Sequence, residues 1–491
     1  MRKADSHRTG AARPRRRPLV ALALVVAVAA SMAAVPGASG SRGQTTLFDL
    51  GGGAFDLPQD QRDGQLKQLQ DFGVDTVRVI VFWDRIAPDV NSSSKPNFNA
   101  ADPDAYPARN WLNLDDSVRD ATARGLDVLL TPSTPAPDWA SSSDGITNPS
   151  ASEFQQFVTA LGKRYSGSFV PAPANPTDPP IPALPRVDDW SVLNEPNLTL
   201  FLKPQLKGGR SVSGRIYREL YLAAQRGLTE TGHGTDTLLI GETSPGPGRA
   251  GTDPITFLRG VFCLNAKFKR AGGCAKIDAD GWAQHPYDPF DAPYEENPNL
   301  INLATIGELT KALNKARSAG AVTRRLPIHV TEYGVESVPD KKFGVSQLRQ
   351  AEYIAISEYL MYRNGRIRSF GQYLMQDDKG NAQINFQTGL RFASGAEKVA
   401  YDAFSIPLVA QRVTEEKKTV KVWGHVRPAN SSVPVTIRAK PGGIVKRIRA
   451  NANGYFQFRT PFRAGRRYSA STRLPDGTEL TGPFVRTYVF K

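Results

Sequence analysis

Residues 187–197 of the chain are VDDWSVLNEPN. This stretch contains the strand formers Val187, Trp190 and Val192, and Pro196 ends the strand because proline has no amide hydrogen for a sheet ladder. Glu195 is therefore expected at the carboxyl end of a buried strand. A second stretch, LPIHVTEYG at 326–334, repeats this design and brings Glu332 to the end of another strand. Together the two stretches predict a pair of carboxyl groups at strand ends.

Strand-like and helix-like segments alternate around these two stretches, from residue 45 to residue 404. Apolar strands separated by helices indicate a parallel sheet covered by helices. Eight such units favour the α/β class with a closed (β/α)8 TIM barrel over a doubly wound sheet, and no Gly-x-Gly-x-x-Gly motif follows the first strand. The expected strands are 45–50, 74–83, 126–132, 187–195, 237–242, 279–285, 326–332 and 369–375, and the expected helices are 59–72, 111–124, 152–165, 216–228, 254–268, 303–318, 346–363 and 395–404.

The pattern changes after residue 410. Short alternating strands are separated by turns such as Asn453-Gly454 and Asp476-Gly477, with no helix signal. This pattern predicts a small all-β, Ig-like sandwich over 411–491. Its expected strands are 419–425, 433–439, 443–450, 456–460, 468–474 and 484–490.

The first forty residues are typical of a secretory signal peptide. Arg13, Arg15, Arg16 and Arg17 precede an apolar run at 19–35 and small residues up to Gly40. We expect cleavage after Gly40, which leaves a barrel domain at 41–410, a secreted protein and no stable membrane span. An uncleaved anchor is the alternative, for which the run is slightly short. The arginine pair leaves both the general secretory and the twin-arginine routes open.

The net charge of +15 is unevenly distributed. Residues 1–40 contribute +6 and residues 411–491 contribute +13, which leaves −4 for 41–410. The C-terminal module therefore carries a basic surface, which either binds an anionic cell-wall polymer or is simply solvated. Nucleic acid is not an expected partner of an exported chain without a reader motif. The basic residues include Lys446, Arg447, Arg449, Arg463, Arg466 and Arg467.

Cys263 and Cys274 are the only cysteines. In an exported chain they are expected to form a local disulfide. No Cys/His cluster accompanies them, so a structural zinc site is not expected.

Several of these motifs resemble one known group of enzymes. Leu193-Asn194-Glu195-Pro196 with Thr331-Glu332-Tyr333-Gly334 is similar to the motif pair of clan A glycoside hydrolases, retaining barrel enzymes with glutamates after strands four and seven. Arg78 in the second strand and His285-Pro286-Tyr287 after the sixth also match, most closely to family 5, the cellulase type, and family 39. The resemblance covers residues 45–405 and implies a glycosidase acting on O-glycosyl bonds, with no metal and no cofactor.

The resemblance also implies residue roles. Glu332 would be the nucleophile, and Glu195 would be the general acid and base. Their carboxyl groups would lie about 5 Å apart. Arg78 and the Tyr287 hydroxyl would keep Glu332 ionised. Asn194 would bind the sugar 2-hydroxyl, and His285 would hydrogen-bond the substrate or Glu195.

Structural alternatives remain open for the supporting residues. Arg78 could instead pair with Asp75 or Asp127 inside the barrel, and His285 and Tyr287 could simply end their strand. Glu242, at the end of the fifth strand, is expected to be a supporting residue.

Aromatic residues near strand ends are candidate sugar platforms. Trp83, Trp139 and Trp282 either stack on sugar rings or pack in the core. Clan A enzymes place a tryptophan at the end of strand eight, where this chain has Tyr373 and Met375. Cellulose or mannan is therefore not the expected substrate.

The sequence predicts a secreted retaining glycosidase that cleaves β-linked glycosides of a poly- or oligosaccharide. Two alternatives remain: a non-catalytic carbohydrate-binding or cell-wall protein on the same barrel, and an inverting hydrolase with carboxyl groups about 6.5–9.5 Å apart. The sequence leaves open the sugar and linkage, endo or exo action and the oligomeric state.

Overall fold

The computed structural model describes residues 44–172, 181–381, 385–428 and 431–491. The expected signal peptide at 1–40 lies outside the described residues.

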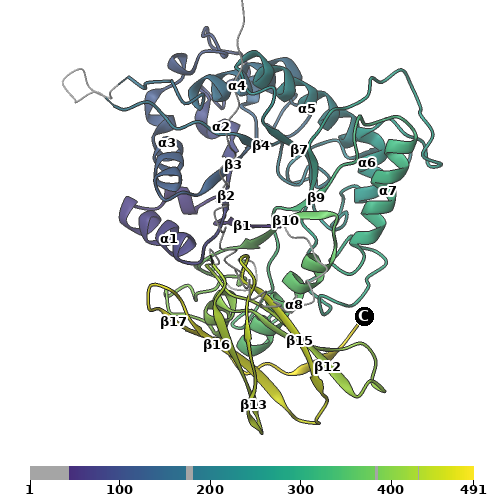
Figure 1. Ribbon diagram of the computed structural model, residues 1–491. Helices are drawn as coiled ribbons and strands as arrows, with labels where there is room; N and C mark the ends of the chain where they lie inside the picture. Colours follow the sequence, from purple (N-terminus) through teal and green to yellow (C-terminus); the bar gives the residue numbers. More distant parts are fainter. Residues whose placement is uncertain (1–43, 173–180, 382–384, 429–430) are drawn as a thin grey trace, which may run out of the picture. The chain divides into compact units, whose positions relative to one another are not determined.

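Eight parallel strands close into a barrel in the order β1-β10-β9-β8-β7-β4-β3-β2 (Figure 1). Every strand expected from the sequence is present, although the fourth and the seventh are only three residues long. The predicted TIM barrel is therefore confirmed. The strands are β1 (Thr45–Asp49), β2 (Thr76–Phe82), β3 (Asp127–Ser133), β4 (Asp189–Ser191), β7 (Thr237–Thr243), β8 (Gly281–Gln284), β9 (Ile328–Val330) and β10 (Ile367–Tyr373).

Helices between the strands surround the barrel (Figure 1). Several begin where a side-chain oxygen accepts a backbone N–H, as Ser150, Asp253 and Ser346 do for α4, α6 and α8. A short antiparallel pair, β5 (Leu206–Lys207) with β6 (Arg210–Ser211), was not expected. The helices are α1 (Gln59–Asp71), α2 (Trp83–Ile86), α3 (Ala108–Ala123), α4 (Ala151–Arg164), α5 (Ser213–Glu230), α6 (Pro254–Val261), α7 (Ile306–Ser318), α8 (Gln347–Arg363) and α9 (Val399–Ser405).

The helix predicted at 254–268 is wrong in its second half. Helix α6 ends at Val261, and Cys263 then takes a left-handed φ of 54°. The expected disulfide is present, since Cys263 is bonded to Cys274. The residues after Val261 therefore form a cross-linked loop that a continuing helix would not allow.

The C-terminal residues form the predicted sandwich of two four-stranded sheets. One sheet has the order β15-β12-β11-β18 and the other β14-β13-β16-β17. β11 and β17 were not expected. The strands are β11 (Leu408–Arg412), β12 (Thr419–His425), β13 (Pro434–Lys440), β14 (Gly443–Arg449), β15 (Tyr455–Pro461), β16 (Arg467–Arg473), β17 (Glu479–Thr481) and β18 (Thr487–Val489).

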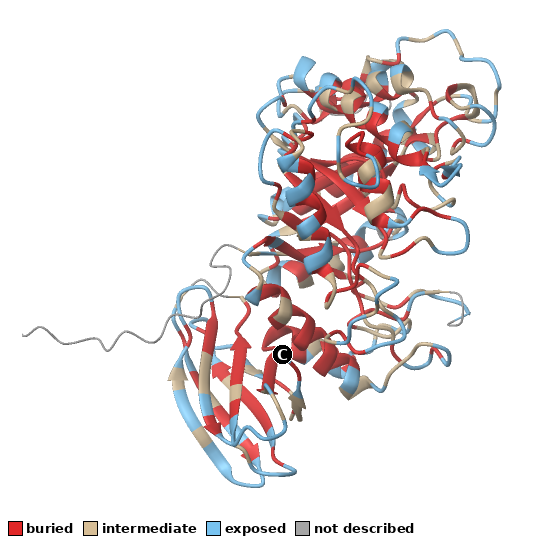
Figure 2. Cartoon of the chain, turned by 90° about the vertical axis from the view of Figure 1, so that its right-hand side faces the viewer, coloured by how far each residue is buried: buried red, intermediate tan, exposed pale blue. Residues whose placement is uncertain are grey.

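Helix α8 connects the barrel to the sandwich through a buried aromatic cluster. Tyr359 and Tyr362 of α8 pack against Trp423 and Tyr455 of the sandwich, and Trp423 has no exposed surface. Figure 2 shows buried residues, in red, on the barrel strands, on the helix beside the sandwich and on several sandwich strands. The two folds therefore share one packed interface.

Buried charges cross the same interface. Glu358 of α8 lies 2.8 Å from His425 Nδ1 and 2.7 Å from Arg427 of the sandwich. Burial would raise the pKa of Glu358, but Arg427 and His425 outweigh burial and lower it to about 2. Glu358 therefore stays ionised, and its partners fix the sandwich to α8.

Among the described residues, no helix combines the length and the apolarity needed to cross a membrane.

Replacing Trp423 with alanine should destabilise the whole chain, because the side chain fills the centre of the interface. We expect a loss of about 3–5 kcal/mol in the free energy of unfolding. Ile444→Ala on the exposed surface of β14 is the matched control and should change it by less than about 0.5 kcal/mol. Calorimetry measures both, and equal effects of the two substitutions would contradict the interface.

Candidate active site

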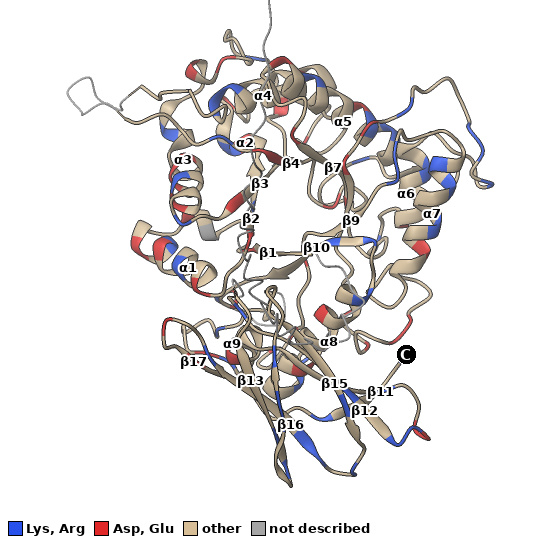
Figure 3. Cartoon of the chain, in the orientation of Figure 1, with Lys and Arg blue, Asp and Glu red and all other residues tan. Residues whose placement is uncertain are grey.

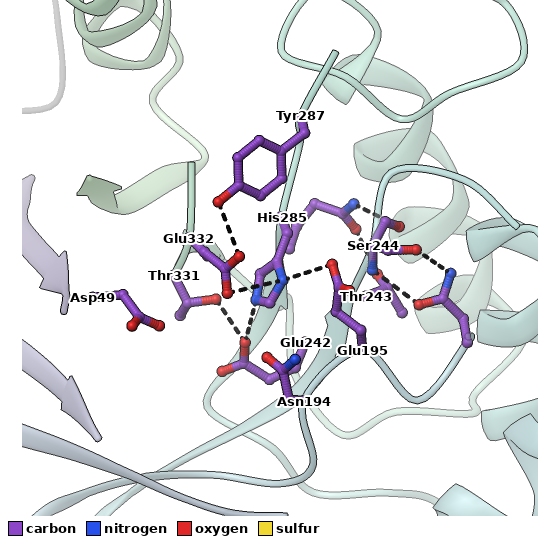
Figure 4. A network of polar contacts seen from close by, with 12 residues as sticks. Asp49, Asn194, Glu195, Glu242, Thr243, Ser244, His285, Tyr287, Thr331 and Glu332 are labelled. Carbon is purple, nitrogen blue, oxygen red and sulfur yellow. Dashed lines mark hydrogen bonds and ion pairs between the residues drawn. The ribbon is translucent and has the colours of Figure 1, made fainter. Parts of the chain in front are cut away.

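Glu195 and Glu332 lie beyond the carboxyl ends of β4 and β9. Glu195 is half-buried, and Glu332 is 8% exposed. The backbone that delivers Glu195 is strained, since Leu193 and Glu195 have φ angles of 55° and 39°. Non-glycine residues in this region cost about 1–3 kcal/mol each and cluster at functional sites. Both side chains point into the same space (Figure 4).

His285, one residue beyond β8, brings the two glutamates together. Its Nδ1 lies 3.1 Å from Glu195 Oε1 and 3.6 Å from Glu332 Oε2. The two carboxylate oxygens are therefore no more than 6.7 Å apart, the sum of 3.1 and 3.6 Å. This upper bound on one pair of oxygens is compatible with the separation of about 5–5.5 Å between the carboxyl groups of retaining enzymes.

Arg78 of β2 lies fully buried beneath the site. Its guanidinium donates to Asp49 at 2.6 Å and to Glu332 at 3.1 Å, and it lies 3.2 Å from Glu242. Burial opposes its charge, but Glu242, Asp49 and Glu332 outweigh burial and raise the pKa of Arg78 above its usual value. The structure thus pairs Arg78 with the site and not with Asp75 or Asp127.

Glu242 reaches the site through a bulge near the end of β7. The pairing of β7 with β8 shifts register between Ile240 and Thr243, and Glu242 has a φ of 50°. Its carboxylate lies 2.8 Å from His285 Nε2 and accepts a hydrogen bond from Thr331 Oγ1 at 2.7 Å. Burial would raise its pKa, but Arg78 and His285 outweigh burial and lower the pKa of Glu242 to about 2. Glu242 is therefore a buried, ionised support.

The charges around His285 set its protonation. Burial disfavours an imidazolium, but Glu332, Glu195 and Glu242 outweigh burial and raise the pKa of His285 to about 10. Burial also raises the pKa of Glu332 to about 7, against the opposing charges of His285 and Arg78. The negative charges of Asp49 and Glu195 act in the same direction as burial on the pKa of Glu332.

Two further expected residues, Tyr287 and Asn194, contact this network. The Tyr287 hydroxyl donates to Glu332 Oε1 at 2.9 Å, and its ring stacks on Tyr333. Asn194 accepts a hydrogen bond from Arg78 at 2.8 Å. Tyr373, at the end of β10, has its pKa raised by burial and by the nearby charge of Glu332. All three lie at the same end of the barrel.

The structure does not bring Trp83 and Trp282 to the site. Both are fully buried, so sugar stacking on them is excluded. Trp83 packs in parallel on Phe157 of α4, and Trp282 packs on Phe262. Trp139 is half-buried, packs edge-on against Trp83 and donates its indole N–H to Pro88 O at 3.0 Å. These large apolar rings lie in or beside the core because their burial stabilises it.

Asp49 is the site residue that the sequence analysis missed. It ends β1, is 1% exposed and accepts hydrogen bonds from Arg78 and from the Gly51 amide. Its position as an acidic residue at a strand end was the available signal.

The described part of the chain contains no group of three His, Cys, Asp or Glu side chains arranged to hold a metal ion. The site lies in a cavity of about 690 Å³. Its walls come from the loops after β4, β7, β8, β9 and β10, and the lining residues include Glu195, Leu198, Ser244, Tyr287, Phe290, Leu300, Glu332, Glu336, Phe343 and Phe386.

Solved glycoside hydrolases share this fold. A family 39 glycoside hydrolase from the gut symbiont Bacteroides cellulosilyticus WH2 is 15% identical, with a TM-score of 0.50 over 88% of this chain and 81% of that chain. A monomeric β-xylosidase from Caulobacter crescentus CB15 is 13% identical, with a TM-score of 0.51 over 90% and 97%. A family 39 β-xylosidase from Caulobacter crescentus is 13% identical, with a TM-score of 0.50 over 90% of this chain and 97% of that chain.

The molecule therefore has the barrel fold of clan A glycoside hydrolases, as its motifs predicted. At these identities the likeness concerns the fold. No model of a known protein family matches the sequence, and no curated protein matches it either.

His285 should remain protonated, and His329 neutral, across the neutral pH range. The anionic partners of His285 raise its pKa to about 10, whereas burial lowers the pKa of His329 to about 4. Nitrogen-15 NMR of the imidazoles should therefore show neither ring titrating between about pH 5.5 and 8.5. Glu242→Gln should lower the pKa of His285 by about 1–3 units, since it removes one close charge. A wild-type His285 midpoint below pH 8 would contradict this electrostatic description.

Proposed function

We propose that this protein is a glycoside hydrolase that cleaves β-linked glycosides with retention of configuration. The observation that carries the proposal is the approach of Glu195 and Glu332 to one nitrogen of His285 at the wall of a large cavity. The limit on their separation is compatible with retention.

Each glutamate has one role in the proposed reaction. Glu332 attacks the anomeric carbon and forms a glycosyl ester, while Glu195 donates its proton to the departing oxygen. In the second step Glu195 takes a proton from water, and the resulting hydroxide displaces Glu332 from the sugar. Arg78 and Tyr287 both contact Glu332, so they stabilise its carboxylate before attack and on departure.

The charges beside Glu332 bear on this division of roles. Double displacement needs one ionised and one protonated carboxyl group at the start. Burial raises the pKa of Glu332 to about 7, while the positive charges of His285 and Arg78 favour its ionised form. The proposed attack uses this ionised form, and Arg78 donates a hydrogen bond to it at 3.1 Å.

Export is part of the proposal. The basic and apolar pattern at 1–40 is that of a signal peptide, and a disulfide suits an oxidising compartment. N-terminal sequencing of protein from culture medium should begin at Ser41; protein retained in cells with its leader would contradict secretion.

We also propose that the sandwich binds an anionic cell-wall polymer. The register of β13 with β14 and β16 pairs Thr436 with Arg447, and Lys440 with Arg467, so their side chains share one face with Arg438. All of these basic residues are exposed. Figure 3 shows blue basic segments along the sandwich strands. The positive charge of these side chains would attract polymers that carry carboxylate, sulfate or phosphate groups.

The triple variant Arg438→Ser, Arg447→Ser and Arg467→Ser should lose cosedimentation with an insoluble acidic polysaccharide at low salt. The wild-type chain should bind and should be released as ionic strength rises. Ile444→Ser on β14 is the matched control. Equal binding by the triple variant would overturn this role.

Glu332→Gln should lower kcat by about 10³-fold or more on any glycoside that the wild type cleaves, because it removes the nucleophile. A 2-deoxy-2-fluoroglycoside with a good leaving group should add one glycosyl unit to the peptide containing Glu332, as mass spectrometry would show. Full activity of the variant, or a label elsewhere, would contradict the mechanism.

Glu308→Gln, on the exposed face of α7, is the control for this change and should retain full activity. Glu195→Ala should lower turnover of glycosides with poor leaving groups by about 10²–10⁴-fold while acidic phenols suffer less. Sugar binding without turnover in the wild type would indicate the non-catalytic carbohydrate-binding alternative.

A further inference from the structure

The wall of the cavity beside Glu195 is apolar. Leu198 follows Glu195 in a turn closed by the Leu198 N–H on Glu195 O at 2.9 Å. The loop after β7 contributes Pro245, whose carbonyl accepts the Ile301 N–H at 2.7 Å and so holds neighbouring Leu300 in the same wall. A Cβ added at Gly246 would lie 2.6 Å from Leu300 Cδ2, so the loop and this leucine are in close contact.

Three loops add aromatic rings to this cavity. Phe290, after β8, is 73% exposed, and its ring meets that of Phe343, after β9, edge to face at 5.1 Å. Phe386, after β10, is 46% exposed. Among the large apolar side chains that the described residues leave exposed, Phe290 and Phe386 are the aromatic ones, and both line this cavity. Exposed apolar surface that gathers at one concave site marks a binding surface.

Several polar groups of the same walls are already bonded within the protein, while the cations of Lys342 and Arg349 lie over the rings of Phe343 and Tyr353. Asp288 accepts hydrogen bonds from the Phe290 amide and from Asn302, and Asp340 accepts two from backbone amides of its own loop. Glu336 accepts the Gln387 N–H at 2.7 Å, and Ser244 donates to Gly246 O at 2.6 Å. A ligand on these walls therefore finds apolar surface more readily than unpaired polar atoms.

The role proposed for Glu195 indicates which part of the substrate lies next to it. The departing oxygen takes its proton from Glu195, so the leaving group lies on the Glu195 side of the sugar. Leu198, three residues after Glu195, and Pro245 line the cavity, whereas Arg78 and Tyr287 hydrogen-bond to Glu332. The apolar wall, defined as Leu198, Pro245, Phe290, Leu300 and Phe343, lines the same cavity as Glu195, and its first two residues come from the loops next to this acid.

We infer that the substrate carries an apolar aglycone, an alkyl or aryl group joined to the sugar through the cleaved oxygen. This inference rests on the proposed glycosidase function. The wall binds the aglycone by burial, while Glu195 protonates the oxygen that leaves with it. A saccharide leaving group, which presents hydroxyls along its length, would find few unpaired partners on this wall.

Alkyl glycosides of graded length test the inference. A panel of 4-nitrophenyl glycosides first identifies the sugar, and methyl, butyl and hexyl glycosides of that sugar are then compared with the matching disaccharide. Burial of each methylene supplies up to about a fourfold gain, so kcat/KM should rise at least about tenfold from methyl to hexyl. The hexyl glycoside should also exceed the disaccharide. A flat series, or a preference for the disaccharide, overturns the apolar aglycone.

Variants of the wall separate this effect from general damage. Phe290→Ser and Leu300→Ser should each lower the hexyl-to-methyl ratio of kcat/KM by about threefold or more. Leu112→Ser, at an apolar residue of α3 that is 48% exposed, is the matched control and should leave the ratio unchanged. Equal ratios in all four proteins would overturn the assignment of the wall.

Failure of the proposed function would look different, because no glycoside in the panel would then be cleaved. Calorimetric binding of hexyl and methyl 1-thioglycosides to the wild-type protein replaces the kinetic comparison in that case. Tighter binding of the hexyl compound, lost in Phe290→Ser, supports the apolar wall without turnover. Equal or absent binding overturns it.

Discussion

The buried guanidinium of Arg78 is the interaction on which the rest of the site depends. Removing a carboxylate from water costs several kcal/mol unless a partner compensates, and Arg78 contacts Asp49, Glu242 and Glu332 with no exposed surface of its own. These acids end or follow β1, β7 and β9, so one cation joins three barrel strands. A lysine would supply the charge without the planar fork that fixes several acceptors at once. The same contact thus permits the barrel to close over buried charge and orients the carboxylate beside the cavity.

Much of this arrangement could be predicted because it depends on local pattern. Apolar runs gave all eight barrel strands, and an acid just before a strand-ending residue identified Glu195 and Glu332 as candidates. The place of Glu242 depends on a bulge in β7, which is a property of the pairing with β8 that one strand's sequence does not specify. Asp49 and its partner Arg78 are 29 residues apart in the sequence. They meet only because the barrel places β1 beside β2, and the sequence of either strand alone does not show this. The prediction that tryptophans near strand ends could bind sugar was wrong for two of them. A position near a strand end does not specify whether the ring points into the core or into the site. Trp83 packs on Phe157 and Trp282 packs on Phe262, both in the core.

The sandwich also contacts the barrel near the cavity, which the sequence pattern of either part alone could not reveal. Tyr353 lines the cavity and packs against Tyr488 of β18, while Tyr294 stacks on Phe490 at 5.0 Å. Arg486, just before β18, pairs with buried Glu352 of α8. The loop after β8 carries both Tyr294 and Phe290, so the C-terminal strand supports a segment that forms the cavity wall. An appended module can in this way influence binding without contacting the substrate.

The end of β10 links the polar and the apolar parts of the cavity. A tryptophan there would offer a broad platform to the sugar, whereas Tyr373 offers a smaller ring whose edge is covered by Phe386 at 5.3 Å. Stacking on the sugar is therefore weaker than in a site with an indole, and more of the binding free energy must come from other contacts. Binding of a part of the substrate that does not react can still lower the barrier if it is used to align the reacting atoms. An apolar wall on the Glu195 side supplies such binding at the leaving group, where alignment of the departing oxygen with the acid decides whether the proton is transferred.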